Sequence, residues 1–343
     1  MVSLLKIVLI TTTVNVPKVL PVYRALDSEA TLIVVGDKKT PHCDVRLLMD
    51  ELQPACYYSV AEQERLGYEC SEIIGWNTVG RRNIAILEAL RLGAEIIISV
   101  NDDDIPMGKD YFNMFRSNLM ESYNGVQLTS SSGWVNVGDL LFPRVYHRGF
   151  PYQEREKEPC KTAPITNVKV GISEGIVMGD PDVDAVDRVA SNPRVLSASD
   201  ILRNGIVVCH NCFSPFNNEN TAYRREIAPV MMLPVGLGRA DDIFSAYVAE
   251  RILADTDYYI HHGQPFAWQQ RNPHDLLSDL SEEMFQMQNV WRFVQSLQAM
   301  KLPNGDTLTK LSHLYGEIAR LKYMPSILNQ LAKAWSTDIE QVL

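Results

Sequence analysis

Short apolar runs alternate with segments of helical periodicity over the first third of the chain. Residues 4–10 and 30–35 are continuous apolar runs, and residues 16–26 between them repeat apolar side chains at helical spacing. Strands with continuous apolar residues are covered on both faces, as in a largely parallel sheet flanked by helices. The pattern predicts two buried strands joined by a helix, the beginning of a doubly wound α/β fold.

The same alternation continues toward residue 104. Residues 82–92 have helical spacing and end at Gly93, a common helix stop, and residues 95–100 form another apolar run. This run leads directly into Asn101-Asp102-Asp103-Asp104. Because ligands of open α/β sheets collect at the carboxyl ends of the strands, we expect these aspartates and Asp37 to lie at one edge of the sheet.

Beyond this part the pattern is less regular. Residues 125–234 are rich in Gly, Pro and Asn and predict loops and an irregular, mixed part of the sheet. A helix is predicted over 240–254, and two or three amphipathic helices over 281–343, with a break at Pro303-Asn304-Gly305. We therefore expect an α/β domain over residues 1–280 and a helical C-terminal extension over 281–343. The extension would pack on the same domain or form a homo-oligomer contact.

Composition indicates an ordinary folded protein, since 46% of its 343 residues are hydrophobic and 22% are charged. The formal net charge of -10 argues against a nucleic-acid or anionic-membrane surface, although local arginines or a metal still suit a phosphate-bearing small molecule. The apolar N-terminus lacks a small-residue cleavage site and favours a buried strand over a signal peptide. We expect no membrane span and a cytoplasmic location.

The cysteines are scattered and fit reduced thiols in a cytoplasmic protein. They stand at positions 43, 56, 70, 160, 209 and 212. Cys209 and Cys212 form half of a zinc knuckle, but no second Cys-x-x-Cys pair completes it, so structural zinc is not expected.

The triple aspartate is the main chemical candidate. Neighbouring carboxylates repel one another unless a cation or solvent compensates them, and Mn²⁺ or Mg²⁺ prefers such oxygen ligands together with diphosphate oxygens and water. In an extended strand, Asp102 and Asp104 would share one face and hold the metal, while Asp103 would contact the nucleotide or sugar. The alternative is a solvated acidic turn.

Further candidates for nucleotide-sugar binding lie at the same edge. Thr11 is in the first strand, Asp37 can accept hydrogen bonds from a base or ribose, and Arg82 opens a helix whose N-terminus favours a diphosphate. Each has a simpler explanation, since Asp after Gly is usually a turn residue and exposed arginine pairs are common.

A second group of candidates lies later in the chain. Arg239 is a candidate nucleotide-sugar contact, and Asp241 and Asp242 either cap a helix or orient an acceptor hydroxyl and act as base. Histidines 261, 262 and 274 are candidate ligands or phosphate contacts, and His262 is assigned to the metal. A histidine is, however, more often structural.

With these residues in place, the chain resembles the reversibly glycosylated polypeptides, which include UDP-arabinopyranose mutases, and more distantly other GT-A glycosyltransferases. The resemblance covers nearly the whole length and rests on the order of several short motifs. They are Asp102 to Asp104, Arg148-Gly149-Phe150-Pro151, Arg155-Glu156, Gly179 to Ala185, Asn220 to Glu226, Gly238 to Asp242, Phe293 to Ser296 and Leu302-Pro303.

The resemblance implies a GT-A-like fold and a UDP-sugar substrate whose anomeric bond to the diphosphate is opened. It implies that Arg148 is the residue that becomes reversibly glycosylated, although Arg148 and Arg155 also suit guanidinium contacts to the diphosphate. Phe150 replaces the tyrosine of the family motif, and the segment from Glu156 to Thr166 is longer than expected. Metal and nucleotide binding therefore transfer more safely than sugar identity.

Three functions remain open from the sequence. The first is a pyranose–furanose mutase, and the second is a glycosyltransferase to an external small-molecule or glycan acceptor. The third is a non-catalytic partner subunit of a glycan-synthesising complex.

Overall fold

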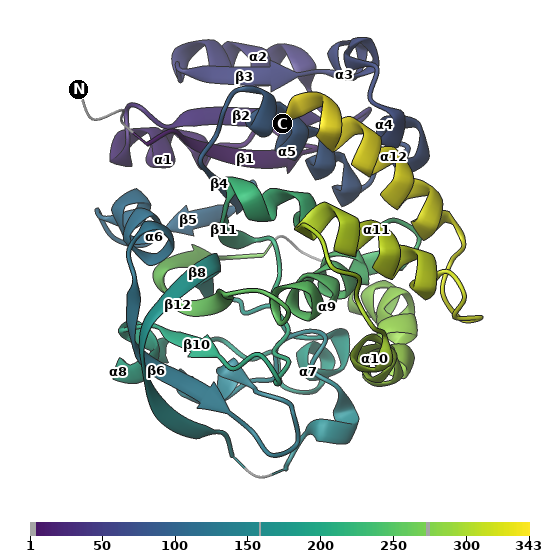
Figure 1. Cartoon of the computed structure of the whole chain (residues 1–343). Helices are drawn as coiled ribbons and strands as arrows, with labels where there is room; N and C mark the ends of the chain where they lie inside the picture. The colour runs from purple at the N-terminus through teal and green to yellow at the C-terminus, as the bar shows by residue number, and fades with distance from the viewer. Residues whose placement is uncertain (1–4, 158, 272–274) are drawn as a thin grey trace.

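The computed structural model describes residues 5–157, 159–271 and 275–343 (Figure 1). The elements up to Met120 are β1 (Ile7–Thr13), α1 (Leu20–Leu26), β2 (Thr31–Gly36), α2 (His42–Glu51), β3 (Ala55–Tyr58), α3 (Val60–Leu66), α4 (Glu69–Ile74), η1 (Val79–Arg81), α5 (Arg82–Arg91), β4 (Ile96–Val100), β5 (Asp104–Pro106) and α6 (Tyr111–Met120). The alternation of strands and helices expected for this part of the chain is confirmed.

The elements of the remainder include a much longer strand and the C-terminal helices. They are β6 (Tyr123–Thr129), η2 (Val137–Leu140), β7 (Leu141–Phe142), η3 (Tyr152–Glu154), β8 (Lys161–Gly179), α7 (Ala185–Ala190), β9 (Ser197–Ala198), α8 (Asp200–Arg203), β10 (Ile206–Val208), β11 (Asn220–Arg224), η4 (Arg225–Met231), η5 (Gly238–Ala240), α9 (Asp241–Leu253), β12 (Tyr258–Gln269), α10 (Leu276–Ala299), α11 (Thr307–Ile318) and α12 (Ile327–Val342). The 19-residue β8 was not foreseen, because Gly and Asn interrupt its apolar pattern.

The sheet changes character halfway across. Its strand order is β3-β2-β1-β4-β11-β8-β6-β10-β12-β5, and the first four strands are parallel. Beyond β4 the pairings are mixed, since β11 runs antiparallel to both β4 and β8. β1 pairs with β2 on one side and β4 on the other, so the strand order reverses there. Such a switch point leaves a crevice at the carboxyl ends of the strands, where ligands bind in α/β proteins.

Both faces of the parallel part are buried. Val8 and Ile10 of β1 belong to one apolar cluster with residues of α5 and α9, whereas Ile7 and Leu9 belong to a second cluster with residues of α1, α2 and α6. Successive side chains of a strand point to opposite faces, so a continuous apolar run fills both layers. This arrangement explains the lack of alternation in the sequence.

The C-terminal helices pack on the first of these faces. Figure 1 shows α12 beside α4 and α5, with α11 against α12. Trp335 of α12 is completely buried in the same apolar cluster as Ile84 of α5, and its indole Nε1 donates to the carbonyl of Pro229 at 2.8 Å. The break predicted at 303–305 falls between α10 and α11, as expected. Within the described ranges, no helix has the length and apolarity needed to cross a membrane.

The replacement Trp335→Ala tests whether the extension and the sheet unfold together. It removes a fully buried ring and should cost about 3–5 kcal/mol in free energy of unfolding, because the cavity relaxes only partly. Urea unfolding followed by both tryptophan fluorescence and circular dichroism should show one shifted transition. The exposed Lys333 on the same helix provides the control, and Lys333→Ala should change stability by less than about 0.5 kcal/mol. Two separate transitions in Trp335→Ala would contradict the expectation.

Candidate active site

A cavity of about 270 Å³ lies at the carboxyl ends of β1, β2 and β4. It brings together three residues predicted for nucleotide-sugar binding, Asp37, Arg82 and Asp102. The residues that line it are Thr12, Thr13, Val14, Val35, Asp37, Asn77, Thr78, Val79, Arg81, Arg82, Asn101 and Asp102. The expectation that Asp37 and the aspartates after β4 gather at one sheet edge is met by Asp37 and Asp102.

Asp37 braces one wall of this cavity. Its Oδ2 accepts the backbone N–H of Asn77 at 2.7 Å and that of Thr78 at 3.3 Å, and its Oδ1 accepts the N–H of Lys38 at 2.6 Å. A carboxylate can accept more hydrogen bonds than these three, so the side chain retains capacity toward a ligand. Asp37 therefore serves both as a turn residue, the alternative considered from the sequence, and as part of the cavity wall.

Thr11 does not line the cavity. Its side chain is fully buried within β1, whereas Thr12 and Thr13 reach the wall. The Oγ1 of Thr13 donates to Oδ2 of Asp102 at 2.5 Å and so couples the end of β1 to the aspartate turn. The sequence analysis named a threonine of the correct strand. The threonines that line the cavity are the next two residues of β1, Thr12 and Thr13.

Arg82 connects the cavity to the central strands. Its Nη1 donates to the carbonyl of Asn218 at 2.6 Å, and its Nη2 donates to Oδ1 of Asn101 at 2.9 Å. The guanidinium is nearly completely buried, and burial lowers the pKa of Arg82, with Asp242 and Glu219 opposing this effect. Its Nε has no hydrogen-bond partner. A buried donor without a partner is costly, and an anion in the cavity would remove that cost.

The triple aspartate adopts a turn rather than an extended strand, so the expected alternation of faces does not hold. Asp102 bonds to Thr13 at the cavity, and Asp103 accepts from Nε2 of Gln269 at 3.3 Å. Asp104 begins β5 and is completely buried. Asp102 and Asp104 therefore point to different neighbours, and the charge of Asp103 acts on both.

Asp104 lies beside a second buried acid that the sequence reasoning missed, Glu219. Burial raises the pKa of Asp104 well above its usual value, and the charges of Glu219 and Asp103 raise it further. Burial and nearby Asp182 also raise the pKa of Glu219 to about 7. Oδ1 of Asp104 and Oε2 of Glu219 both lack hydrogen-bond partners. Two buried acids with unpartnered oxygens need a shared proton or a cation to relieve their repulsion.

Gln269 and Arg271 link the aspartate turn to the middle of the chain. Gln269 donates to Asp103, and its Oε1 accepts from Nε of Arg271 at 3.0 Å. Nη2 of Arg271 donates to Oδ1 of Asp182 at 3.2 Å and lies 3.7 Å from Oε1 of Glu219. Asp182 belongs to a motif noted in the sequence, but the end of β12 carried no such signal.

Arg148 is the centre of this network. Its Nε and Nη2 donate to the two oxygens of Asp182 at 2.8 and 3.0 Å. Its Nη1 and Nη2 donate to the oxygens of Asp242 at 3.0 and 2.7 Å, and Nη1 also donates to the carbonyl of Arg239. A guanidinium has five N–H donors, so all are used. The diphosphate contact considered for Arg148 would require breaking one of these bonds.

The charges around Arg148 stabilise one another. Burial by itself would lower the pKa of Arg148, but Asp182 and Asp242 raise it well above its usual value. Burial by itself would raise the pKa of Asp182, but Arg148 and Arg271 lower it below its usual value. Arg148 and Asp182 are therefore both charged in the folded state.

Two other predicted site residues are engaged elsewhere. Arg155 pairs with Asp184 at 2.7 Å and Asp187 at 3.1 Å, at the start of α7. The Arg239 side chain pairs with Asp279 and Glu283 of α10, each at 3.2 Å. These arginines fasten loops to helices, and their guanidinium groups are not brought to the cavity beside Asp102.

Asp241 is the first residue of α9 and does not cap the helix, because the N-cap position is held by Ala240 and no side chain caps it. Oδ1 of Asp241 accepts the backbone N–H of Leu237 at 3.0 Å, at the start of α9. Burial raises the pKa of Asp241 to about 7, although the Leu237 N–H opposes this effect. Of the acidic pair, only Asp242 joins the Arg148 network.

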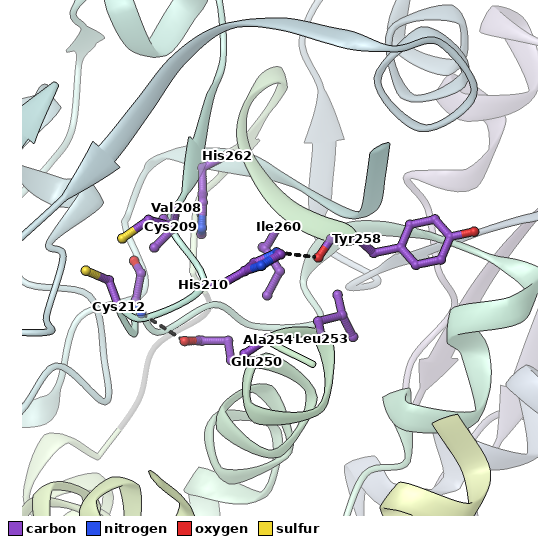
Figure 2. Close-up of a pocket in the computed structure, with 11 residues that line it drawn as sticks. Val208, Cys209, His210, Cys212, Glu250, Leu253, Ala254, Tyr258, Ile260 and His262 are labelled. Atoms are coloured by element: carbon purple, nitrogen blue, oxygen red, sulfur yellow. Dashed lines mark hydrogen bonds between the residues drawn. The ribbon is translucent and has the colours of Figure 1, made fainter. Parts of the chain in front are cut away.

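His262 lies in a different cavity from Asp102. Figure 2 shows it with Cys209, His210 and Glu250 around a small cavity of about 20 Å³. Its Nδ1 lies 2.6 Å from Oε2 of Glu174, and its Nε2 has no hydrogen-bond partner. The structure does not bring His262 to the aspartate turn, because it lies seven positions before Gln269 along β12, and Gln269 is the residue that pairs with Asp104. His274 lies outside the described residues.

The cysteines of Figure 2 likewise hold no recognisable metal centre. The described ranges contain no group of three or more His, Cys, Asp or Glu side chains arranged to hold a metal ion. Cys209 and Cys212 are both buried and free.

No protein-family model matches the sequence, and no curated protein sequence matches it.

Replacing Arg148 tests the network directly. Arg148→Met removes the cation that compensates the buried Asp182 and Asp242. The free energy of unfolding, measured by urea denaturation, should therefore fall by about 3–5 kcal/mol. Arg148→Lys keeps the positive charge but loses the two-pronged guanidinium hydrogen bonds. Its free energy of unfolding should therefore lie between those of Arg148→Met and the wild type. As a control, Arg144→Met removes an arginine with a 46%-exposed side chain and should cost less than about 1 kcal/mol. Wild-type stability of Arg148→Met would refute the role given to the network.

The buried Asp241 should make stability depend on pH. Its pKa of about 7 lies above the ordinary value of 3.8, so its contribution is fully present below about pH 4 and is lost as pH rises through 7. Asp241→Asn should therefore gain stability relative to the wild type between pH 4 and 8, by roughly 4 kcal/mol at most. Urea unfolding at several pH values measures this difference, and the exposed Asp110→Asn should give a flat difference. A flat difference for Asp241→Asn would show that this carboxyl is ionised throughout.

Proposed function

We propose that this chain is a metal-dependent nucleotide-sugar enzyme that breaks the bond between the anomeric carbon and the diphosphate, with a UDP-sugar as substrate. The observation that carries the proposal is the cavity at the strand-order switch point, which combines Asp37, Arg82 and Asp102. Switch points of parallel sheets are where nucleotides bind in many α/β proteins. The GT-A-like fold suggested by the sequence motifs belongs to the same proposal.

The cavity offers suitable partners for each part of a nucleotide. Asp37 can accept hydrogen bonds from a base or ribose, and the unpartnered Nε of Arg82 is a donor for a diphosphate oxygen. The 270 Å³ volume lies near the lower end of the range for ligand pockets, about 300–1,000 Å³. The sugar would then extend past Asp102 toward Asp103.

The donor set suits Mn²⁺ or Mg²⁺ rather than a softer metal. Asp102, Asp103 and Asp104 supply carboxylate oxygens, and Oδ1 of Asp104 is buried without a partner. These ions often take only one or two carboxylates and complete their shell with diphosphate oxygens and water. A bound ion would neutralise charge on the departing diphosphate, and the protein residues would orient the sugar.

Arg148 receives a positioning role in this proposal. A nucleophile needs a free lone pair, and a charged guanidinium that donates five hydrogen bonds has none to offer. Glycosylation of Arg148 would first require loss of its bonds to Asp182 and Asp242. Arg148 instead holds Asp242, the residue we assign to a sugar or acceptor hydroxyl.

Two reactions fit this site, and a third reading is not enzymatic. A mutase would change the ring form of the sugar and return it to the nucleotide, whereas a transferase would pass it to an external acceptor. The chain would be a non-catalytic subunit if it bound no nucleotide-sugar. The buried Nε of Arg82 has no hydrogen-bond partner, which lowers the stability of the folded protein. A bound diphosphate would supply that partner, and this favours the two enzymatic functions.

Binding is tested by thermal denaturation with UDP and UDP-sugars, with and without Mn²⁺. A ligand that binds only the folded state stabilises the protein by about 2.7 kcal/mol when its concentration is 100 times its dissociation constant. This stabilisation should raise the melting temperature by several degrees. Asp102→Asn should lose most of the Mn²⁺-dependent shift, and the exposed Asp110→Asn should retain it. The absence of any shift with every nucleotide-sugar would remove both enzymatic readings.

The products of the same incubations separate the two reactions. Ring-isomerised UDP-sugar formed without an acceptor, detected by chromatography, identifies a mutase. Hydrolysis alone, or product only after addition of an acceptor, identifies a transferase.

A further inference from the structure

A second cavity, of about 300 Å³, lies between the segment that follows β8 and the beginning of α10. Three arginines line it, Arg188, Arg194 and Arg271, although the chain as a whole carries a formal charge of -10. It shares no lining residue with the cavity beside Asp102. Three guanidinium groups around one cavity indicate a site for a negatively charged group.

Arg188 is the least expected of the three. Only 7% of the residue is exposed, and its Nε has no hydrogen-bond partner, while its Nη2 donates to the carbonyl of Pro181. Burial lowers the pKa of Arg188, and the nearby charge of Arg271 lowers it further. Asp182 and Glu219 compensate the charge of Arg271, whereas the unused Nε donor of the buried Arg188 is costly to leave without a partner. An anion that accepts a hydrogen bond from this nitrogen would offset that cost.

The acidic residues of the wall are already engaged. Asp180 accepts the backbone N–H of Arg271 at 3.0 Å and lies 3.8 Å from Nε of Arg194. Asp279 pairs with Arg239 at 3.2 Å. Arg194 lies 3.8 Å from Asp180 and its side chain is 49% exposed, so it can turn toward a bound anion.

The cavity is connected to the proposed active site by two side chains. Arg271 donates to Gln269, and Gln269 donates to Asp103. A molecule bound among the three arginines would therefore contact Arg271, which is linked to the aspartate turn through Gln269. Such a position suits a sugar acceptor if the nucleotide occupies the cavity beside Asp102.

We propose that the cavity lined by Arg188, Arg194 and Arg271 binds a phosphate or carboxylate group of the molecule that accepts the sugar. The proposal rests on the proposed function for the identity of that molecule, and it favours the transferase over the mutase. The anion site itself is independent of the nucleotide. It orients an acidic acceptor, such as a sugar phosphate or a sugar acid, with its hydroxyl toward Asp103.

Calorimetric titration with inorganic phosphate at constant ionic strength, without nucleotide, tests the site. Arg194→Gln should weaken phosphate binding about tenfold, the effect of losing one charge-assisted hydrogen bond. Arg188→Gln should weaken it at least as much, and Arg194→Gln decides the result if the buried replacement prevents folding. The control is Arg320→Gln, at a side chain 76% exposed on the far helical extension, which should bind phosphate like the wild type.

The outcomes separate this proposal from the proposed function. Phosphate binding that is absent from the wild type, or equal in Arg194→Gln and Arg320→Gln, overturns the anion site even if UDP-sugars bind. Phosphate binding that is lost in Arg194→Gln while no nucleotide-sugar binds retains the anion site and removes the nucleotide-sugar function. A parallel titration with acetate distinguishes a carboxylate from a phosphate, because only the preferred group should show the tenfold difference.

Discussion

Compensation of the buried Arg148 guanidinium is the constraint on which the site depends. Asp182 follows β8, Asp242 begins α9 and the carbonyl of Arg239 precedes it, so one side chain joins three segments distant in sequence. A buried charge without partners costs several kcal/mol, and removal of any member would expose the others to that cost. The network therefore fixes the segments after β8 and at the start of α9 relative to one another. Arg271, which donates to Asp182, and Gln269, which donates to Asp103, connect these segments to the aspartate turn.

The other half of the site follows from parallel strand geometry. β1, β2 and β4 all point their carboxyl ends toward the same edge, so whatever follows them converges there. Thr13, Asp37 and Asp102 meet for this reason, and Arg82 enters from the start of α5, which is buried from Arg82 to Leu90. The cavity beside Asp102 is thus a property of the topology, whereas its polar lining depends on a few short turns.

Two of the cavities differ in the charge of their lining. One is lined by Asp37, Arg82 and Asp102, and the other by three arginines around α7 and the end of β12. The hydrogen bonds from Gln269 to Asp103 and from Arg271 to Gln269 connect the aspartate turn to a wall of the second cavity. In the proposed transfer reaction, these contacts would help to hold the donor and the acceptor close together before they react.

The sequence by itself determined the parallel strands, the buried α5 and the edge at which Asp37 and Asp102 meet, because continuous apolar runs and helical spacing are local signals. The break between α10 and α11 was predictable for the same reason, since Pro and Gly act on their immediate neighbours. Only the tertiary structure decided which charges pair. The partners of these charges are far apart along the chain, and no local pattern specifies them. The pairs are Arg148 with Asp182, Asp104 with Glu219, and Glu174 with His262. The turn of Asp102 to Asp104 was likewise decided by contacts with Thr13 and Gln269, which lie on other strands, rather than by the strand that precedes it.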